Sequence, residues 1–249
     1  MTTTTRLRLK RKIEKLNERL LSLGALVEEN VGLAIRALER GDAETATRVI
    51  DGDVEVDRME VDLEEECLEI LALHQPVAVD LRHIIAVLKI NKDLERAGDL
   101  AVNIAETALH LSGDSRIHIP KAYFVMAAKA QSMLNQSLDA FVNMAVDEAY
   151  RLLREDDDVD RMKHSLHGKF EERLQEEPAL LQPLIHLFLV SRHLEQIADL
   201  ATNISEEVIY MITGEIVRHG RKATGLRPLL EKDTLLARRE LGRINGTVQ

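Results

Sequence analysis

The fold is decided by the stretch Leu94-Glu95-Arg96-Ala97-Gly98-Asp99-Leu100-Ala101-Val102-Asn103-Ile104-Ala105-Glu106, because a second copy of it stands one hundred residues later. The second copy reads Leu194-Glu195-Gln196-Ile197-Ala198-Asp199-Leu200-Ala201-Thr202-Asn203-Ile204-Ser205-Glu206, and eight of the thirteen positions are identical. A whole segment that returns at such a distance indicates two copies of one structural unit. The chain is therefore interpreted as two units built around these segments.

Both copies have the periodicity of a helix. At about 100° per residue, the polar residues fall within roughly 80° of one another and the apolar residues cluster on the opposite side. In the first copy the polar set is Glu95, Asp99, Asn103 and Glu106, and the apolar set is Leu94, Ala97, Ala101 and Ile104. Each segment is predicted to be a helix with one face in a core and an acidic stripe facing away from it.

Composition favours an all-α protein. The 249 residues are 45% hydrophobic, enough for one large or two small domains, and include only 12 Gly, 5 Pro and 3% aromatic residues. A net charge of −10 disfavours nucleic-acid binding, because phosphates attract clustered Lys and Arg. No apolar run approaches the roughly 18 residues of a membrane span, so we expect a soluble cytoplasmic protein. The single cysteine, Cys67, is expected to be structural and half-buried.

Helical spacing divides each half of the chain into three helices. The predicted helices are residues 7–38, 42–73 and 76–111, then 123–153, 157–174 and a last helix from 178 or 183 to 211 or 212. They give each half a long-medium-long order, and Asp42 is the predicted N-cap of the second helix. Short connections place consecutive helices antiparallel. The predicted fold is all-α, with two tandem three-helix up-down-up bundles of six long helices, a pseudo-twofold repeat similar to spectrin repeats.

The boundary between the halves is placed at Ser112-Gly113-Asp114-Ser115, which is followed by Pro120. The predicted domains are residues 1–113, residues 114–213 and a basic C-terminal tail of residues 214–249. The tail has a weak helical pattern at residues 229–241, and its basic residues are Arg218, Arg221, Lys222, Arg227, Lys232, Arg238, Arg239 and Arg243. A solvated tail is favoured over a dedicated partner site.

Acidic residues recur in pairs four positions apart, a spacing that puts both on one face of a helix. The repeated stretch carries Glu95 with Asp99 and Glu195 with Asp199, and the helix before it in each half carries Asp53 with Asp57 and Asp156 with Asp160. If the two helices of each half pack antiparallel, four carboxylates gather at one edge. That arrangement is costly without a cation, because like charges raise each other's pKa.

Two interpretations of these pairs remain open. One like-charge pair on an exposed helix costs only about 0.2–0.5 kcal/mol, and acids near a helix start favour the helix dipole, which would explain Asp53 and Asp156 as plain surface. Recurrence in the same register favours a metal-binding edge instead. Oxygen ligands suit hard ions such as Mg²⁺, Ca²⁺, Mn²⁺ or oxidised iron.

Signatures of catalysis are absent from the sequence. No Gly-rich phosphate loop, nucleophile elbow or nucleophile–base arrangement occurs, so an enzyme is not expected. None of the nine histidines stands three residues after a Glu, as the ligands of ferritin-like di-iron bundles do. His83, His186 and His193 are expected to be packing or surface residues.

The sequence resembles the PhoU family, the phosphate-signalling regulators associated with bacterial phosphate uptake. The resemblance spans roughly residues 7–213 and is carried by residues 50–57, by Pro76-Val77-Ala78-Val79-Asp80-Leu81-Arg82, by residues 93–104 and by the weaker copy at 195–203. It implies a cytoplasmic, non-enzymatic negative regulator of the phosphate regulon. The resemblance also implies that the protein forms a homodimer. The implied partners are the ATPase of a phosphate ABC transporter and a sensor histidine kinase.

The resemblance also implies multinuclear metal binding at the acid pairs of some family members. By motif match, the metal positions are Asp53, Asp57, Glu95, Asp99, Asp156, Asp160, Glu195 and Asp199. The second repeat departs from the family in having Gln182-Pro183-Leu184 where the first has its Asp-Leu-Arg element. An alternative function is a helical-bundle protein that stores or oxidises iron, which the missing Glu-x-x-His motifs disfavour.

Overall fold

The computed structural model describes residues 3–113 and 117–217, and every regular element among them is helical. The elements are α1 (Thr3–Arg40), α2 (Ala43–His74), α3 (Ala78–Leu111), α4 (Lys121–Val142), α5 (Val146–Glu176), the short 3-10 helix η1 (Pro178–Leu180) and α6 (Leu181–Thr213). The all-α prediction is confirmed, and the repeated stretches lie in the middle of α3 and α6.

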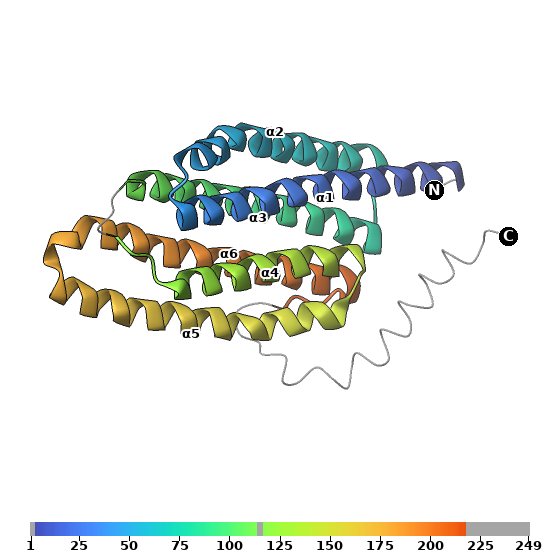
Figure 1. The fold of residues 1–249 in the computed structure, drawn as a ribbon. Helices are drawn as coiled ribbons and strands as arrows, with labels where there is room; N and C mark the ends of the chain where they lie inside the picture. Colours follow the sequence, from blue (N-terminus) through green and yellow to red (C-terminus); the bar gives the residue numbers. More distant parts are fainter. Residues whose placement is uncertain (1–2, 114–116, 218–249) are drawn as a thin grey trace.

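The six helices form two three-helix bundles that lie side by side. Helices α1, α2 and α3 pack on one another, as do α4, α5 and α6, and Figure 1 shows the two groups with their long axes running in a similar direction. The bundles meet where α3 packs along α6 and α1 contacts α4. The two helices that carry the repeated stretch therefore form the centre of the molecule.

The apolar faces predicted from helical spacing are buried. Leu94, Ala97, Ala101 and Ile104 on α3 have no exposed surface, and the equivalent residues of α6 are buried as well. Residues from all six helices join in one continuous hydrophobic core. The acidic stripes lie outside this core, at the edges where α2 meets α3 and where α5 meets α6.

Local sequence explains the turns of the first bundle. Gly41 supplies a φ of +64° between α1 and α2, a value that a residue without a Cβ adopts at little cost. The Asp42 side chain accepts a hydrogen bond from the Thr45 N–H at 3.1 Å, so its prediction as the N-cap of α2 is confirmed. Helix α2 ends at Gln75, whose left-handed backbone donates an N–H to the Leu71 carbonyl.

The second bundle differs from its prediction at the α4–α5 connection. Helix α4 ends at Val142 and α5 begins at Val146, so the predicted fourth helix through residue 153 is wrong. Met144 turns the chain with a φ of +50°. In the sequence, apolar residues keep a helical spacing across this turn, because the end of α4 and the start of α5 both contribute residues to one core. Phe141 and Ala149 are examples, and both are buried. The long-medium-long order is also wrong, since α4 has 22 residues and α5 has 31.

The position of this turn changes the setting of the acids on α5. Asp156 lies ten residues after the first residue of α5, and Asp53 lies ten residues after the first residue of α2. The field of a helix dipole falls off within the first turn. Proximity to a helix start therefore does not explain either aspartate, and both stand in the same register of their helices.

The basic residues of the predicted tail, from Arg218 onward, lie outside the described residues, and the division into separate domains stays a prediction. In the described part of the chain, none of the helices combines the length and the apolar run that crossing a bilayer requires.

Candidate functional site

The first carboxylate cluster lies between α2 and α3. It consists of Asp53, Asp57 and Glu60 from α2 and Glu95 and Asp99 from α3. The spacings of four and seven residues place the α2 acids on one side of their helix, and the spacing of four does the same on α3. Two pairs that lie far apart in sequence thus face each other across one helix–helix edge, as their spacing predicted.

Gly98 allows the helices of this cluster to approach closely. A Cβ added at Gly98 would lie 3.1 Å from the Val56 Cγ1 atom and 3.5 Å from the Asp53 Oδ1 atom. The Asp53 carboxylate therefore lies close to α3 at Gly98, which is next to Asp99 and three residues after Glu95. Glycine at this position keeps the two acidic stripes of the first bundle next to each other.

The carboxylates of the first cluster affect one another's ionisation. Burial and the negative charges of Asp57, Asp99 and Glu95 raise the pKa of Asp53 to about 6. Burial and neighbouring carboxylates also raise the pKa of Asp99, against the opposing effect of Lys92 and Arg96. Glu60 has a raised pKa for the same reasons, burial first. Lys92 and Arg96 therefore offset only part of the negative charge in this cluster.

An exposed lysine lies beside the first cluster. The Lys92 Nζ atom lies 3.0 Å from the Glu95 Oε2 atom, and the Lys92 side chain is 58% exposed. Lys92 precedes Glu95 by three residues on α3, so this ion pair lies along one helix and does not bridge α3 to α2. An exposed pair of this kind contributes little and can rotate into solvent.

The second carboxylate cluster lies between α5 and α6. It consists of Asp156 and Asp160 from α5 and Glu195 and Asp199 from α6. Burial, followed by the charges of Glu195, Asp156 and Asp160, raises the pKa of Asp199 to about 7. Burial and neighbouring acids also raise the pKa of Asp156. The four predicted acids of this half are therefore brought together as in the first half.

A lysine lies inside the second cluster. The Lys163 Nζ atom is 2.6 Å from the Glu195 Oε1 atom and 3.7 Å from the Asp160 Oδ1 atom. The ion pair with Glu195 bridges α5 to α6, and both of its side chains are only 19% exposed. Lys163 opposes the rise in pKa of both Asp156 and Asp199.

Donor chemistry suits a hard cation at the first cluster more than at the second. Among the described residues, none of the five carboxylates of the first cluster forms an ion pair that joins α2 to α3, although Lys92 lowers the pKa of Glu60. In the second cluster, the Lys163 ammonium group already joins α5 to α6. Within residues 3–113 and 117–217, no three His, Cys, Asp or Glu side chains stand close enough together to hold one metal ion as they lie. A cation would therefore require the carboxylates to change rotamer. The eight predicted ligand positions remain predictions.

Glu60 and Lys163 were not predicted as part of the clusters, although they occupy equivalent positions of the two repeats. Each follows the second aspartate of its pair by three residues, in Asp57-Arg58-Met59-Glu60 and in Asp160-Arg161-Met162-Lys163. A spacing of seven from the first aspartate keeps both on the acidic face of their helices. Comparing the two repeats for three residues beyond the second aspartate would have found the difference.

Cys67, His83 and His186 lie outside both clusters. Cys67 is fully buried, more than expected, and burial raises the pKa of its thiol to about 12. His83 donates from Nε2 to the Asn17 Oδ1 atom at 2.7 Å, and burial lowers its pKa to about 4. His186 stacks on His110 with ring centroids 4.8 Å apart. These histidines pack against neighbouring helices, as expected.

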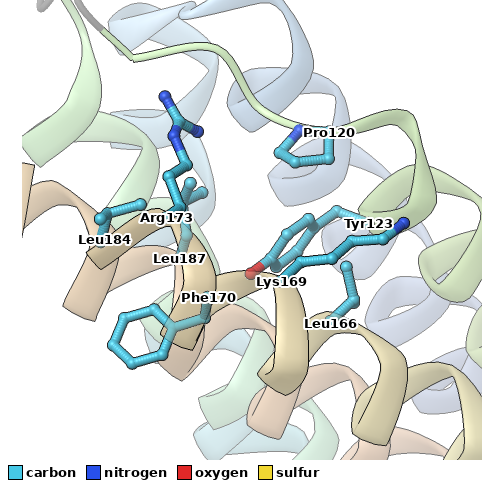
Figure 2. A pocket seen from close by; sticks show the side chains of 8 residues that line it. All are labelled: Pro120, Tyr123, Leu166, Lys169, Phe170, Arg173, Leu184 and Leu187. Carbon is cyan, nitrogen blue, oxygen red and sulfur yellow. The ribbon is translucent and has the colours of Figure 1, made fainter. Parts of the chain in front are cut away.

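The cavities do not coincide with the carboxylate clusters. The one in Figure 2 has a volume of about 50 Å³, room for water but not for a larger ligand. It lies between α4, α5 and α6, with Tyr123, Leu166 and Phe170 around it. A wider hollow of about 470 Å³ lies beside Arg40 and Lys121, near the end of α1 and the start of α4. Neither is lined by a predicted ligand residue.

Comparison with known proteins identifies the repeated unit. The chain matches the PhoU domain family over residues 20–108 and 125–208, one match in each bundle. A phosphate-specific transport system accessory protein PhoU homolog of Clostridium acetobutylicum is 36% identical over 206 residues, which are 82% of this chain and 94% of the relative. The phosphate-specific transport system accessory protein PhoU of Serratia marcescens is also 36% identical, over 83% of this chain and 85% of its own.

Solved structures agree with the sequence comparison. The crystal structure of PhoU from Pseudomonas aeruginosa superposes with a TM-score of 0.79 at 34% identity, covering 83% of this chain and 99% of that one. The phosphate transport system regulatory protein PhoU from Streptococcus pneumoniae gives the same TM-score of 0.79 at 28% identity, covering 85% and 100%. The six-helix arrangement is therefore the arrangement of these proteins.

Proposed function

We propose, from the premise that this chain belongs to the PhoU family, that it is an accessory protein of a phosphate transport system and a regulator of phosphate uptake. The observation that carries the proposal is the match of both bundles to the PhoU domain, together with relatives named for phosphate transport over more than four-fifths of the chain. Accessory and regulatory proteins act by binding, so we propose no catalytic role.

The proposed partners follow from the same premise. The chain would bind the ATPase of a phosphate ABC transporter and a sensor histidine kinase, and would repress the phosphate regulon when phosphate is plentiful. It would act in the cytoplasm, as a homodimer and without binding nucleic acid. The net charge of −10 supports the last point, because it opposes contact with a phosphate backbone.

A hard cation at the first cluster is the second part of the proposal. Asp53 and Asp57 on α2 and Glu95 and Asp99 on α3 would supply its oxygen ligands, with Glu60 next to them. The raised pKa of Asp53 and Asp99 supports this, because a bound cation would stabilise the ionised carboxylates that now repel one another. The cation would hold α2 against α3.

A reporter experiment tests the regulatory role. Deleting the gene in its native host should raise expression from a phosphate-regulon promoter in phosphate-rich medium, because a negative regulator is lost. Capture of the native transporter ATPase by the tagged chain should accompany this effect. An unaltered reporter together with no captured ATPase would refute the proposed function.

A double substitution tests the metal site. Glu95→Ala with Asp99→Ala should remove most of the Mn²⁺ retained after dialysis, measured by elemental analysis, while circular dichroism and oligomeric state stay unchanged. Glu171→Ala with Glu172→Ala is the matched control, because it removes two exposed carboxylates from α5. Equal Mn²⁺ content in both variants would reject the site.

Iron storage is the competing function, and the family match disfavours it. An iron-storage protein would oxidise Fe²⁺ catalytically in air and accumulate a mineral core. Aerobic incubation with Fe²⁺, followed by absorbance and by electron microscopy of the product, should reveal neither. A growing iron core would replace the regulatory proposal with the storage function.

A further inference from the structure

The two carboxylate clusters differ at one equivalent position, where Glu60 of α2 corresponds to Lys163 of α5. The correspondence is fixed by the aspartates, because Asp53 and Asp156 stand at the same distance from the first residues of their helices. One cluster therefore has a carboxylate where the other has an ammonium group. The family resemblance that assigns metal to both halves does not distinguish these positions.

Lys163 is held where it neutralises acids of both helices. Its Nζ atom is 2.6 Å from the Glu195 Oε1 atom, a charge-assisted hydrogen bond, and 3.7 Å from the Asp160 Oδ1 atom. Its side chain is 19% exposed, whereas Lys92 beside the first cluster is 58% exposed. Lys92 can turn into water, but Lys163 is enclosed between α5 and α6.

An enclosed ammonium group opposes a metal ion in two ways. It occupies one of the two Glu195 carboxylate oxygens, Oε1, and its positive charge repels a second cation placed among the same carboxylates. To bind there, a metal ion would have to displace Lys163 from a partly buried ion pair. The donor set of the second cluster therefore does not fit a metal ion.

We propose that Lys163 is a built-in cation that closes the second carboxylate cluster to metal ions. The chain then carries one exchangeable cation site, at the first cluster, and one cluster compensated by its own side chain. The claim of a cation site at the first cluster rests on the proposed function. The claim that Lys163 excludes metal ions from the second cluster does not depend on that site.

The experiment removes the first cluster and then opens the second. In a Glu95→Ala, Asp99→Ala background, Mn²⁺ is titrated and free Mn²⁺ is followed by its electron paramagnetic resonance signal. The background should bind no Mn²⁺ at micromolar concentration. Adding Lys163→Glu, which reproduces the Glu60 side chain, should create about one site per chain and tighten Mn²⁺ binding at least tenfold. Lys163→Ala should give a smaller gain, because it removes the ammonium group without adding a ligand.

Controls separate this effect from a change in net charge or folding. Lys169→Glu makes the same charge change at an exposed position of α5 and should create no site. Adding Asp199→Ala to the Lys163→Glu variant should abolish the new site. Circular dichroism reports folding, and if Lys163→Glu unfolds the chain, Lys163→Ala decides the question.

Two results would overturn the proposal. The first is Mn²⁺ binding by the background with Lys163 intact that is lost on Glu195→Ala with Asp199→Ala. The second is a folded Lys163 variant that gains no Mn²⁺ binding. If the first cluster binds no metal, the result looks different, because the wild-type chain and the Glu95→Ala, Asp99→Ala background would then bind the same amount of Mn²⁺. The Lys163 variants would still show whether Lys163 keeps Mn²⁺ out of the second cluster.

Discussion

The two bundles share one backbone plan, but they compensate their acidic edges differently. Between α2 and α3, five carboxylates gather with the exposed Lys92 and Arg96 beside them, whereas between α5 and α6 the enclosed Lys163 bridges the helices. The aspartates that begin each pattern, Asp53 and Asp156, keep the same register in both halves. A repeat can therefore preserve helix packing while a difference at one equivalent position, Glu60 or Lys163, changes how its acidic edge is compensated.

The two carboxylate clusters differ in burial as well as in charge. Asp99 is exposed, but its counterpart Asp199 is half-buried, and burial is the largest cause of the pKa shift at both. The pKa of Asp199 reaches about 7 even though Lys163 lowers it. The second cluster is thus the less hydrated one, where an internal ion pair is screened least by water and salt.

The largest expected difference between the bundles lies in their cores. Leu63 and Leu166 are equivalent in the repeat, but Leu63 is fully buried whereas Leu166 lines the cavity of about 50 Å³ in Figure 2. Leu63→Ala should lower the free energy of unfolding by about 4 kcal/mol, and Leu166→Ala by about 2 kcal/mol, because water can enter next to residue 166. Urea denaturation measures both. Equal losses would show that the two cores are packed alike, and the exposed Leu73→Ala is the control.

The largest acid sensitivity caused by a single histidine is expected in the first bundle. Burial lowers the pKa of His83 to about 4 from 6.5, whereas the equivalent position of the second repeat is Pro183. Because the folded state binds this proton more weakly than the unfolded state, stability present above pH 6.5 is lost as pH falls towards 4, by up to about 3 kcal/mol.

Replacing His83 separates its effect from other acid-induced losses. His83→Gln can still donate to Asn17 but cannot titrate, so its melting temperature should fall less between pH 7 and pH 4 than that of the wild type. The exposed His118→Gln variant should follow the wild type. Parallel curves for His83→Gln and wild type would mean that His83 does not cause the acid sensitivity.

At the clusters themselves, a smaller effect of opposite sign is expected. The pKa of Asp199 is raised from 3.8 to about 7, so the folded state holds this proton more tightly and loses stability as pH rises through that range. Asp199→Asn should therefore raise the melting temperature by a few degrees at pH 8 and hardly at all at pH 4, in metal-free buffer. Asp53→Asn should gain less, because the pKa of Asp53 is about 6. An equal gain at both pH values would contradict this account, and Asp51→Asn is the exposed control.

The smallest effect is expected where Gly98 corresponds to Ala198. Alanine favours a helix over glycine by about 1 kcal/mol, but the Cβ of Gly98→Ala would meet the Val56 Cγ1 atom at 3.1 Å. The two effects should nearly cancel, leaving the unfolding free energy within about 0.5 kcal/mol, whereas Ala198→Gly should cost about 1 kcal/mol. A large loss in Gly98→Ala would mean that α2 and α3 cannot separate even slightly.

Sequence periodicity predicted most of this fold, for identifiable reasons. The duplicated stretch fixed two units, and the apolar face of Leu94 and Ala97 fixed the side of α3 that enters the core. The turn at residues 143–145 escaped prediction, because Asn143-Met144-Ala145 contains no Gly or Pro and the buried residues on either side maintain a helical period.

The acid pairs on each helix could be predicted from the sequence, but the lysine that neutralises the second cluster could not. A spacing of four residues places Glu95 with Asp99 whatever the tertiary structure, so the pairs could be found in the sequence. The contact between Lys163 and Glu195 joins residues 32 positions apart on different helices. Only the packing of α5 on α6 brings that ammonium group to that carboxylate, and no local pattern encodes it.

One continuous core shared by all six helices limits how the chain can be cut. A fragment that ended after α3 would present to water the apolar surface that α6 now covers, and the complementary fragment would do the same with α6. Each would be prone to aggregate or to pair with a second fragment. Truncated versions are therefore poor substitutes for the intact polypeptide, and co-expression of both fragments is the sounder route to a folded split protein.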